Sequence, residues 1–171
     1  MRLFDNIKIF LNEIERVNTV LIISHRNADA DAIVSAEMLK KAIIKRNPNV
    51  HIEILFPNGI STKSKRICEY LNVEFSEEVK KDYFQYDMLI FIDIGSEEVL
   101  EEAEKLLETE KSTKILIDHH IHQISFLRKF DLVIASSGFS STCEIVYEIA
   151  KRLNLMMNKQ MTIALMAAII V

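Results

Sequence analysis

The chain has 171 residues, of which 49% are hydrophobic and 27% are charged, and its formal net charge is −4. This balance is typical of one globular domain with a sizeable core and excludes a disordered chain. The negative charge also excludes a general basic surface for nucleic acid, although bound divalent cations could supply positive charge locally for a nucleotide substrate.

Cysteine usage and the termini indicate where such a protein works. Cys68 and Cys143 form no CxxC pair, so we interpret them as reduced, partly buried thiols of an intracellular protein. Residues 1–16 mix charges with apolar side chains, unlike a signal peptide. The apolar run at 163–171 is far too short to span a membrane. We therefore expect a cytoplasmic protein without membrane association.

Apolar spacing in the first half of the chain predicts alternating helices and strands. Leu3, Ile7, Phe10 and Ile14 mark one face of an amphipathic first helix. The elements expected after it are a buried strand at 19–24, a helix with its apolar stripe at 33–43, a strand at 51–56, a short helix at 64–71 and a short strand at 73–75.

The same alternation continues in the second half. The elements expected there are strands at 88–94, 114–118 and 132–135, and helices over 99–107, over 146–153 and from 160 onward. Strands alternating with helices predict an α/β domain with right-handed crossovers. We expect three layers, α/β/α, around a mostly parallel sheet of about five strands.

Acidic and imidazole side chains follow three of the predicted strands: His25, Asp29 and Asp31; then Asp93; then Asp118, His119 and His120. Because sites in open parallel sheets gather beyond the carboxyl ends of the strands, we expect these groups to converge. Mixed His and Asp ligands without a thiolate favour Mn²⁺, Mg²⁺, Fe²⁺ or Zn²⁺ over a Cys-type structural zinc. Asp93, from the middle of the sheet, is placed to bridge two ions that together stabilise an in-line displacement at phosphorus.

Simpler interpretations compete with a metal site. The segment 27–38 resembles a calcium loop superficially, but Ala32 replaces the required glycine and Met38 the required glutamate. Asp29 alone could be only the N-cap of the following helix. A lone Asp93 is more often a strand-end turn residue. The coincidence of three strand ends favours the metal site.

Three motifs, His25-Arg-Asn-Ala-Asp29-Ala-Asp31, Ile92-Asp93-Ile94-Gly95-Ser96 and Asp118-His119-His120, resemble the successive motifs of the DHH phosphoesterase superfamily. The resemblance extends from about Thr19 to the last residue. Members include RecJ-like exonucleases, nano-RNases that also dephosphorylate 3′-phosphoadenosine 5′-phosphate, cyclic dinucleotide phosphodiesterases and one class of inorganic pyrophosphatase. The resemblance implies a phosphoesterase with two Mn²⁺ ions, or Mg²⁺ or another divalent metal, that acts on nucleotides or short oligonucleotides.

The resemblance also implies residue roles. The metal ligands would be His25 and Asp29 for the first ion, Asp31 and His119 for the second, and Asp93 as the bridge. His120 would face the substrate phosphate and act in catalysis with Asp93, whereas Asp118 would orient its neighbours. Ala28 stands where a pyrophosphatase or a typical nano-RNase has proline. This loosens the turn but removes no ligand.

A serine-rich segment precedes one of the last helices. Ser141 and Glu144 have the spacing of a capping box, which is a structural role. The family carries a similar segment near its site, so Ser140, Ser141 and Thr142 could also present a helix N-terminus to phosphate. His51 and His122 match no motif and are interpreted as ordinary polar positions. Arg26 and Arg128 could steer phosphate, but solvated surface arginines are the preferred interpretation.

The end of the sequence departs from the family pattern. A further aspartate of the second metal site would follow an apolar run like 167–171, and a smaller C-terminal substrate-binding domain usually comes after it. We therefore expect residues 1–171 to be a DHH domain truncated before this aspartate, with a weakened second metal site and poor turnover. Its apolar end would favour a homo-oligomer. Two alternative functions stay open: an inorganic pyrophosphatase, and a non-catalytic scaffold of a nucleic-acid-processing assembly.

Overall fold

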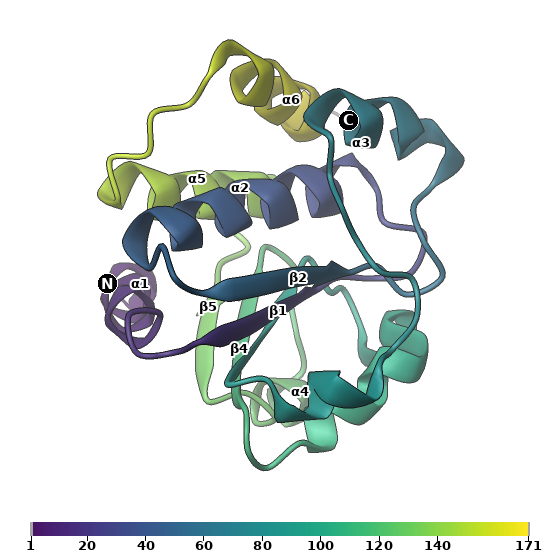
Figure 1. Cartoon of the computed structure of the whole chain (residues 1–171), viewed down its shortest axis with the longest axis vertical. Helices are drawn as coiled ribbons and strands as arrows, with labels where there is room; N and C mark the ends of the chain where they lie inside the picture. The colour runs from purple at the N-terminus through teal and green to yellow at the C-terminus, as the bar shows by residue number, and fades with distance from the viewer. Residues whose placement is uncertain (1, 171) are drawn as a thin grey trace.

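The chain forms a five-stranded sheet in the order β2-β1-β3-β4-β5, and every neighbouring pair is parallel. This computed structural model describes residues 2–170. The strands are β1 (Thr19–Ile23), β2 (His51–Leu55), β3 (Met88–Ile92), β4 (Thr113–Asp118) and β5 (Leu132–Ala135). Helices lie on both faces of the sheet (Figure 1). The expected α/β/α architecture with a parallel sheet is confirmed.

The two faces of the sheet have different covers. One core lies under α1 (Arg2–Glu13), α2 (Ala30–Arg46) and α5 (Thr142–Arg152), with α3 (Lys65–Leu71) and α6 (Lys159–Ile170) farther out. The other core lies under two 3₁₀ segments, η2 (Lys81–Gln85) and η3 (Glu97–Glu108), and the short helix α4 (Ile124–Leu127). A short 3₁₀ turn, η1 (Thr62–Ser64), leads into α3. No helix among residues 2–170 is both long and apolar enough to cross a membrane.

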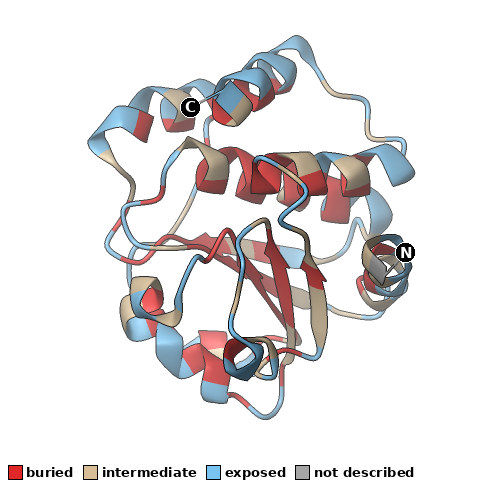
Figure 2. Cartoon of the chain, turned by 180° about the vertical axis from the view of Figure 1, so that it is seen from behind, coloured by how far each residue is buried: buried red, intermediate tan, exposed pale blue. Residues whose placement is uncertain are grey.

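The central strand β3 is apolar throughout because both of its faces are covered. Because successive side chains of a strand point to opposite faces, Ile90 and Ile92 belong to the core under α2, whereas Leu89 and Phe91 belong to the core under η3. All five residues of β3 are buried, as a strand covered on both faces requires. Figure 2 shows the buried sheet between helices whose outer faces are exposed.

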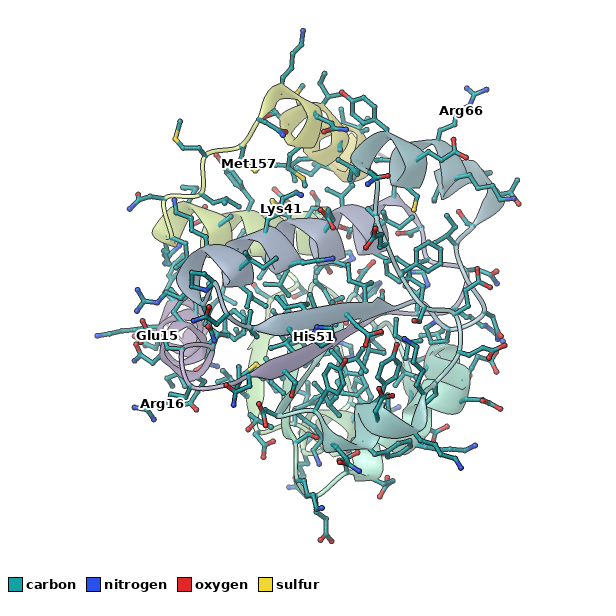
Figure 3. The ribbon with its side chains drawn as sticks, in the orientation of Figure 1. Glu15, Arg16, Lys41, His51, Arg66 and Met157 are labelled. Carbon is teal, nitrogen blue, oxygen red and sulfur yellow. The ribbon has the colours of Figure 1, made fainter. Side chains whose placement is uncertain are left out.

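Most charged side chains lie at the periphery instead, and the buried exceptions among the described residues are Glu37, Asp93 and Asp118. Glu15, Arg16 and Arg66 are exposed and project from the ribbon in Figure 3. The interior and the surface are therefore separated in the way that the alternating apolar pattern predicts.

Two sequence predictions are wrong in detail. Residues 73–75 form no strand, because the segment meets the edge of the sheet only at an isolated bridge between Leu55 and Ser76. The helix expected over 99–107 is a 3₁₀ segment interrupted at Glu101, whose φ is 51°. Its buried residues Leu100, Ala103 and Leu106 recur every three positions, a spacing that the 3₁₀ period satisfies as well as the α-helical one. The segments η2 and α4 were not expected, since each is too short to give a periodic signal.

Truncating a buried side chain of β3 tests the core under α2. Ile90→Ala removes a fully buried side chain, so we expect the free energy of unfolding to fall by about 2–5 kcal/mol. Urea denaturation measures this change. The same substitution at Ile9, which is 48% exposed on α1, is the matched control and should cost much less. Equal losses in the two variants would contradict the assigned core.

Candidate metal centre

The polar residues after β1, β3 and β4 meet at one edge of the sheet. β1 pairs with β2 on one side and with β3 on the other, so the chain reverses its direction of travel across the sheet between β1 and β3. Open parallel sheets hold ligands at such a switch point, beyond the carboxyl ends of the strands. A cavity of about 300 Å³ opens there and is lined by His25, Asp29, Asp31, Asp93, Gly95, Val99, His119 and His120.

His25, Asp29 and Asp93 form the first cluster. His25 Nε2 lies 4.0 Å from Asp29 Oδ1 and 3.8 Å from Asp93 Oδ2. His25 Nδ1 donates to the carbonyl oxygen of Arg26 at 2.8 Å. With its proton on Nδ1, a neutral His25 keeps a lone pair on Nε2, the atom that faces the two carboxylates. The three side chains have donor atoms mutually close enough to share one ion.

His119, Asp31 and Asp93 form the second cluster. His119 Nε2 lies 3.9 Å from Asp31 Oδ2 and 3.7 Å from Asp93 Oδ1. Asp93 therefore turns one carboxylate oxygen toward His25 and the other toward His119. Two atoms that each bond one ion at about 2.0–2.2 Å lie roughly 3–4 Å apart. The separations in both clusters fit that range and exceed a direct hydrogen bond.

Asp93 is held in an unfavourable setting. Its φ of 58° is in the left-handed region, which turns the chain sharply directly after β3. The residue is 3% exposed. Burial raises the pKa of Asp93 well above its ordinary value, and the nearby carboxylates of Asp31, Asp118 and Asp29 raise it further. The hydrogen bond from Thr142 Oγ1 at 2.9 Å opposes this shift without overcoming it.

Asp31 lies against the N-terminus of α5. Its Oδ2 accepts from the backbone N–H of Thr142 and its Oδ1 from that of Cys143, both at 2.8 Å. A carboxylate is favoured there because these N–H groups lack partners within the helix. The Thr142 and Cys143 amides are thus occupied by a side chain of this protein, whereas the family resemblance had left open that this N-terminus faces phosphate.

The neighbouring serines are arranged around Glu144. Its Oε2 accepts from the N–H and the hydroxyl of Ser140, both at 2.7 Å, and from the N–H of Ser141 at 3.3 Å. Glu144 therefore reaches back to the two residues directly before α5, as the capping-box spacing predicts. Asp29 caps α2 in a comparable way, since Oδ1 accepts from Ala32 N at 3.1 Å. Asp29 is thus both a helix cap and part of the first cluster.

Asp118 is fully buried and anchors the loop that carries the histidines. Its Oδ1 accepts from the backbone N–H of His120 at 3.1 Å and from His120 Nδ1 at 2.7 Å. Its Oδ2 accepts from Ile94 N at 2.8 Å and from His122 Nε2 at 3.0 Å. Burial opposes ionisation, but the hydrogen bonds from His120 and His122 outweigh it and hold the pKa of Asp118 well below its ordinary value. The hydrogen bond between the Asp118 carboxylate and the His120 ring also raises the pKa of His120.

His122 is a residue that the sequence interpretation missed. Its side chain is only 2% exposed, and it pairs with Asp118 instead of facing solvent. The signal available in the sequence was its position four residues after Asp118, next to the histidine pair, but a loop gives no periodicity that would indicate burial. Arg26 pairs with Glu101 at the surface, which agrees with its assignment to an exposed position.

Removing the His122 imidazole should weaken this anchor. In His122→Ala, Asp118 Oδ2 keeps only the Ile94 N–H, so we expect unfolding to become easier by about 1–3 kcal/mol. Because the folded-state pKa of Asp118 is depressed, its contribution to stability is present above the unfolded pKa and is lost as pH falls through the folded value. A less depressed pKa in the variant should move acid unfolding to higher pH. Circular dichroism from pH 7 down to acid measures this, with the exposed His51→Ala as the control; coincident curves would contradict the role.

Neutralising Asp93 should stabilise the protein when no divalent ion is bound. A raised carboxyl pKa means that the folded state disfavours the ionised form of Asp93. The free energy of unfolding is therefore not reduced by Asp93 at acid pH, and it falls as pH rises and the carboxyl group ionises. We therefore expect Asp93→Asn in a chelator to increase the free energy of unfolding by about 1–3 kcal/mol at pH 8, and by less at pH 5. Urea titrations of both proteins, with the exposed Asp82→Asn as the control, measure this. A destabilised variant at pH 8 would refute the interpretation.

Comparison with known proteins places the fold in a family. The N-terminal domain of the DHH family matches residues 19–169. An uncharacterised protein of Methanocaldococcus jannaschii is 30% identical over 157 residues, covering 88% of this chain and 44% of that protein. An exopolyphosphatase-related protein from Bacteroides fragilis has the same fold, with a TM-score of 0.79, 20% identity, and coverage of 95% of this chain and 48% of that one.

A second solved structure, exonuclease RecJ bound to manganese, is more distant. Its TM-score is 0.54 at 17% identity, over 99% of this chain and 43% of that one. This chain thus spans less than half the length of each of these three proteins. The family match nevertheless covers nearly the whole sequence and includes every residue of the two clusters. The chain therefore belongs to the DHH family, and residues 19–169 match the N-terminal domain of that family.

Proposed function

We propose that this chain is the metal-binding part of a phosphoesterase that hydrolyses phosphodiester or phosphomonoester bonds of nucleotides or short oligonucleotides with two divalent ions. The observation that carries the proposal is the placement of Asp93, whose two carboxylate oxygens face two separate histidine–aspartate clusters. Membership of the DHH family supports a phosphoesterase in general terms. The name of the manganese-bound RecJ structure is consistent with Mn²⁺ as the ion.

The donor set fits a divalent cation. The cavity is lined by three carboxylates and three imidazoles, and no lysine or arginine is among its lining residues. A buried carboxylate without a counter-charge is strongly unfavourable, so buried charges are normally paired or bound to metal. The pKa of Asp93 is raised by burial and by the neighbouring carboxylates, as expected for a carboxylate that lacks a positive counter-charge. Cations at the two clusters would remove the conflict.

We assign His25 and Asp29 to the first ion, Asp31 and His119 to the second, and Asp93 to both. Three of these assignments have further support in the side-chain contacts: the Asp29 and Asp31 carboxylates are oriented by backbone N–H groups, and the His25 ring by the Arg26 carbonyl. Such outer contacts orient ligands and set the histidine tautomer. When bound, the ions would supply charge to the phosphate oxygens and activate water for attack at phosphorus.

His120 is proposed to contact the phosphate. Asp118 binds its Nδ1, which leaves Nε2 as the other hydrogen-bonding atom of a ring that is 40% exposed at the cavity. The hydrogen bond to Asp118 raises the pKa of His120, which favours the protonated imidazolium. A cationic N–H donor at this point would bind an anionic oxygen and could hold the proton that the leaving group needs. Thr142 would act indirectly by orienting Asp93.

Metal binding and hydrolysis can be tested separately. We expect calorimetric titration of the purified chain with Mn²⁺ to show binding, and bis(p-nitrophenyl) phosphate to be hydrolysed only when Mn²⁺ is present. In Asp93→Asn, loss of the shared charge should weaken Mn²⁺ affinity by roughly 10–100-fold and abolish turnover. Asp82→Asn, an exposed site away from the cavity, is the matched control. Normal Mn²⁺ affinity in Asp93→Asn would remove that residue from the bridging role, and absence of Mn²⁺ binding by the wild type would refute the proposed function.

A further inference from the structure

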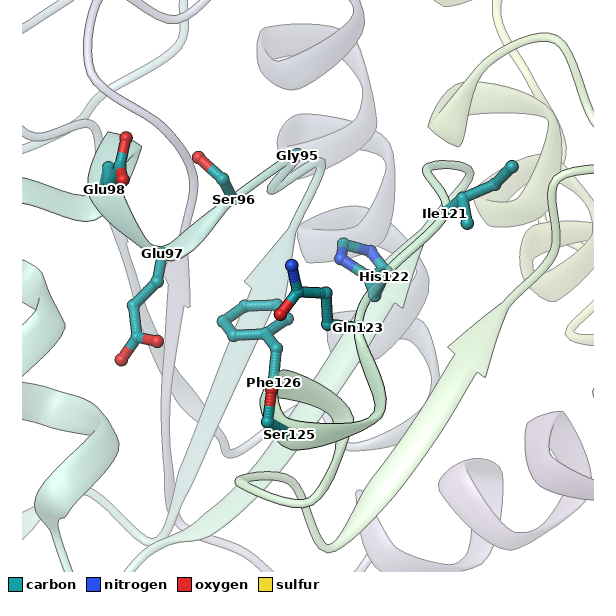
Figure 4. Close-up of a pocket in the computed structure, with 9 residues that line it drawn as sticks. All are labelled: Gly95, Ser96, Glu97, Glu98, Ile121, His122, Gln123, Ser125 and Phe126. Carbon is teal, nitrogen blue, oxygen red and sulfur yellow. The ribbon is translucent and has the colours of Figure 1, made fainter.

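A second cavity of about 340 Å³ lies beside the metal centre, between the loop that follows β3 and the loop that follows β4. Figure 4 shows residues 95–98 along one wall and residues 121–126 along the other. Gly95 lines this cavity and the metal cavity as well. His120 belongs to the metal cavity and His122 to the second one, and Asp118 binds both rings. The two cavities are therefore neighbours on one rigid framework.

Aromatic rings form part of the lining. His122 and Phe126 have ring centroids 5.2 Å apart at an interplanar angle of 35°. Phe126 packs edge-on against Phe130 and is 7% exposed, so its position is fixed by the core. Asp118 fixes His122. The two buried rings pack beneath the cavity and hold its walls in place, so a ligand bound here would cost little ordering of the protein.

Polar groups with unused hydrogen-bonding capacity surround these rings. The side chains of Ser96, Gln123 and Glu98 line the cavity and are exposed, and no hydrogen bond within residues 2–170 engages any of them. Glu97 differs, because it pairs with Lys129. A carboxylate and an amide together offer two kinds of acceptor and one donor group to a ligand.

The charge of this cavity is opposite to what phosphate needs. Glu98 lines it without an ion-pair partner among residues 2–170, Lys129 compensates Glu97, and no lysine or arginine is among the lining residues. An anionic ligand would be repelled, whereas a neutral ring with N–H donors would be favoured. Exocyclic amino groups of nucleobases are such donors: carboxylates accept from the cytosine amine, and glutamine pairs with the amino edge of adenine.

We infer that this cavity binds an amino-bearing nucleobase of the substrate, next to the phosphate held at the metal centre. The inference rests on the proposed function and deepens it. It separates nucleotides from pyrophosphate and longer polyphosphates, whose chain would place further anionic groups against the Glu98 carboxylate. Ser96, Glu98 and Gln123 are the residues that recognise the base, and the buried rings of Phe126 and His122 support the walls that carry them.

Nucleosides test the cavity without the phosphate. In NMR titrations of the isotope-labelled chain with Mg²⁺ present, we expect adenosine and cytidine to shift the resonances of Gly95, Ser96 and the Gln123 side-chain amide. Uridine, which lacks the amino group, should bind more weakly, and tripolyphosphate should not shift the Ser96 and Gln123 signals. Gln123→Ala and Glu98→Lys should each weaken adenosine or cytidine binding by about tenfold, the loss expected for one good hydrogen bond.

The matched control is Glu110→Lys, which makes the same charge change at an exposed position before β4, at the opposite end of the strands. It should leave nucleoside affinity unchanged. Nucleosides that shift only resonances elsewhere, uridine that binds as well as cytidine, or equal affinity in Glu98→Lys and Glu110→Lys would overturn the inference. Hydrolysis of bis(p-nitrophenyl) phosphate, which carries no base, reports on the proposed function alone. Failure of the nucleobase inference can therefore be distinguished from failure of the proposed phosphoesterase function.

Discussion

Repulsion among carboxylates at the carboxyl ends of β1, β3 and β4 is the constraint on which the site depends. Asp93 is buried with Asp31 and Asp118 close enough to raise its pKa, so the unliganded cluster opposes the folded state. The sheet holds the groups together nonetheless, because its central strand is buried on both faces by two separate cores. The free energy of those cores outweighs the local repulsion, and the site inherits an affinity for cations.

Backbone N–H groups offset this repulsion for some of the carboxylates more than for others. Asp31 accepts from the first turn of α5, Asp29 from the first turn of α2, and Asp118 from Ile94 and His120. Each of these carboxylates therefore has partial positive charge nearby. Asp93 accepts a side-chain hydrogen bond from Thr142 alone among the described contacts. The carboxylate with the least internal compensation is also the one shared by the two clusters, which is where two cations would give the largest benefit.

Structural and functional roles coincide in the same side chains. Asp29 caps a helix and Asp31 neutralises another helix N-terminus, yet both also face an imidazole across a gap that suits a metal ion. Asp118 similarly joins the metal cavity to its neighbour, because it binds His120 on one side and His122 on the other. The neighbouring cavity is acidic and aromatic, whereas the metal centre would be cationic once loaded. Such a contrast suits a substrate with one neutral and one anionic part.

The sequence by itself determined the layers, the parallel strands and the edge at which the polar groups meet. Buried strands such as β3 are continuous apolar runs, and the side chain that follows each run must lie at the carboxyl edge of the sheet. Local pattern therefore sufficed to find the positions of His25, Asp93 and His119. It failed at 73–75, where a short apolar stretch was insufficient to form a strand, and at η3, where a three-residue spacing suited two helix types.

Only the tertiary structure decided the partners. Asp31 and Cys143 are 112 positions apart, and no local spacing indicates that the Asp31 carboxylate occupies the N-terminus of α5. His122 lies in a loop without periodicity, so its burial against Asp118 emerged only when the loops after β3 and β4 were packed together. The physical reason is common to both cases. Backbone dihedral preferences and apolar spacing act over a few residues, whereas hydrogen bonds between distant segments depend on how the layers pack.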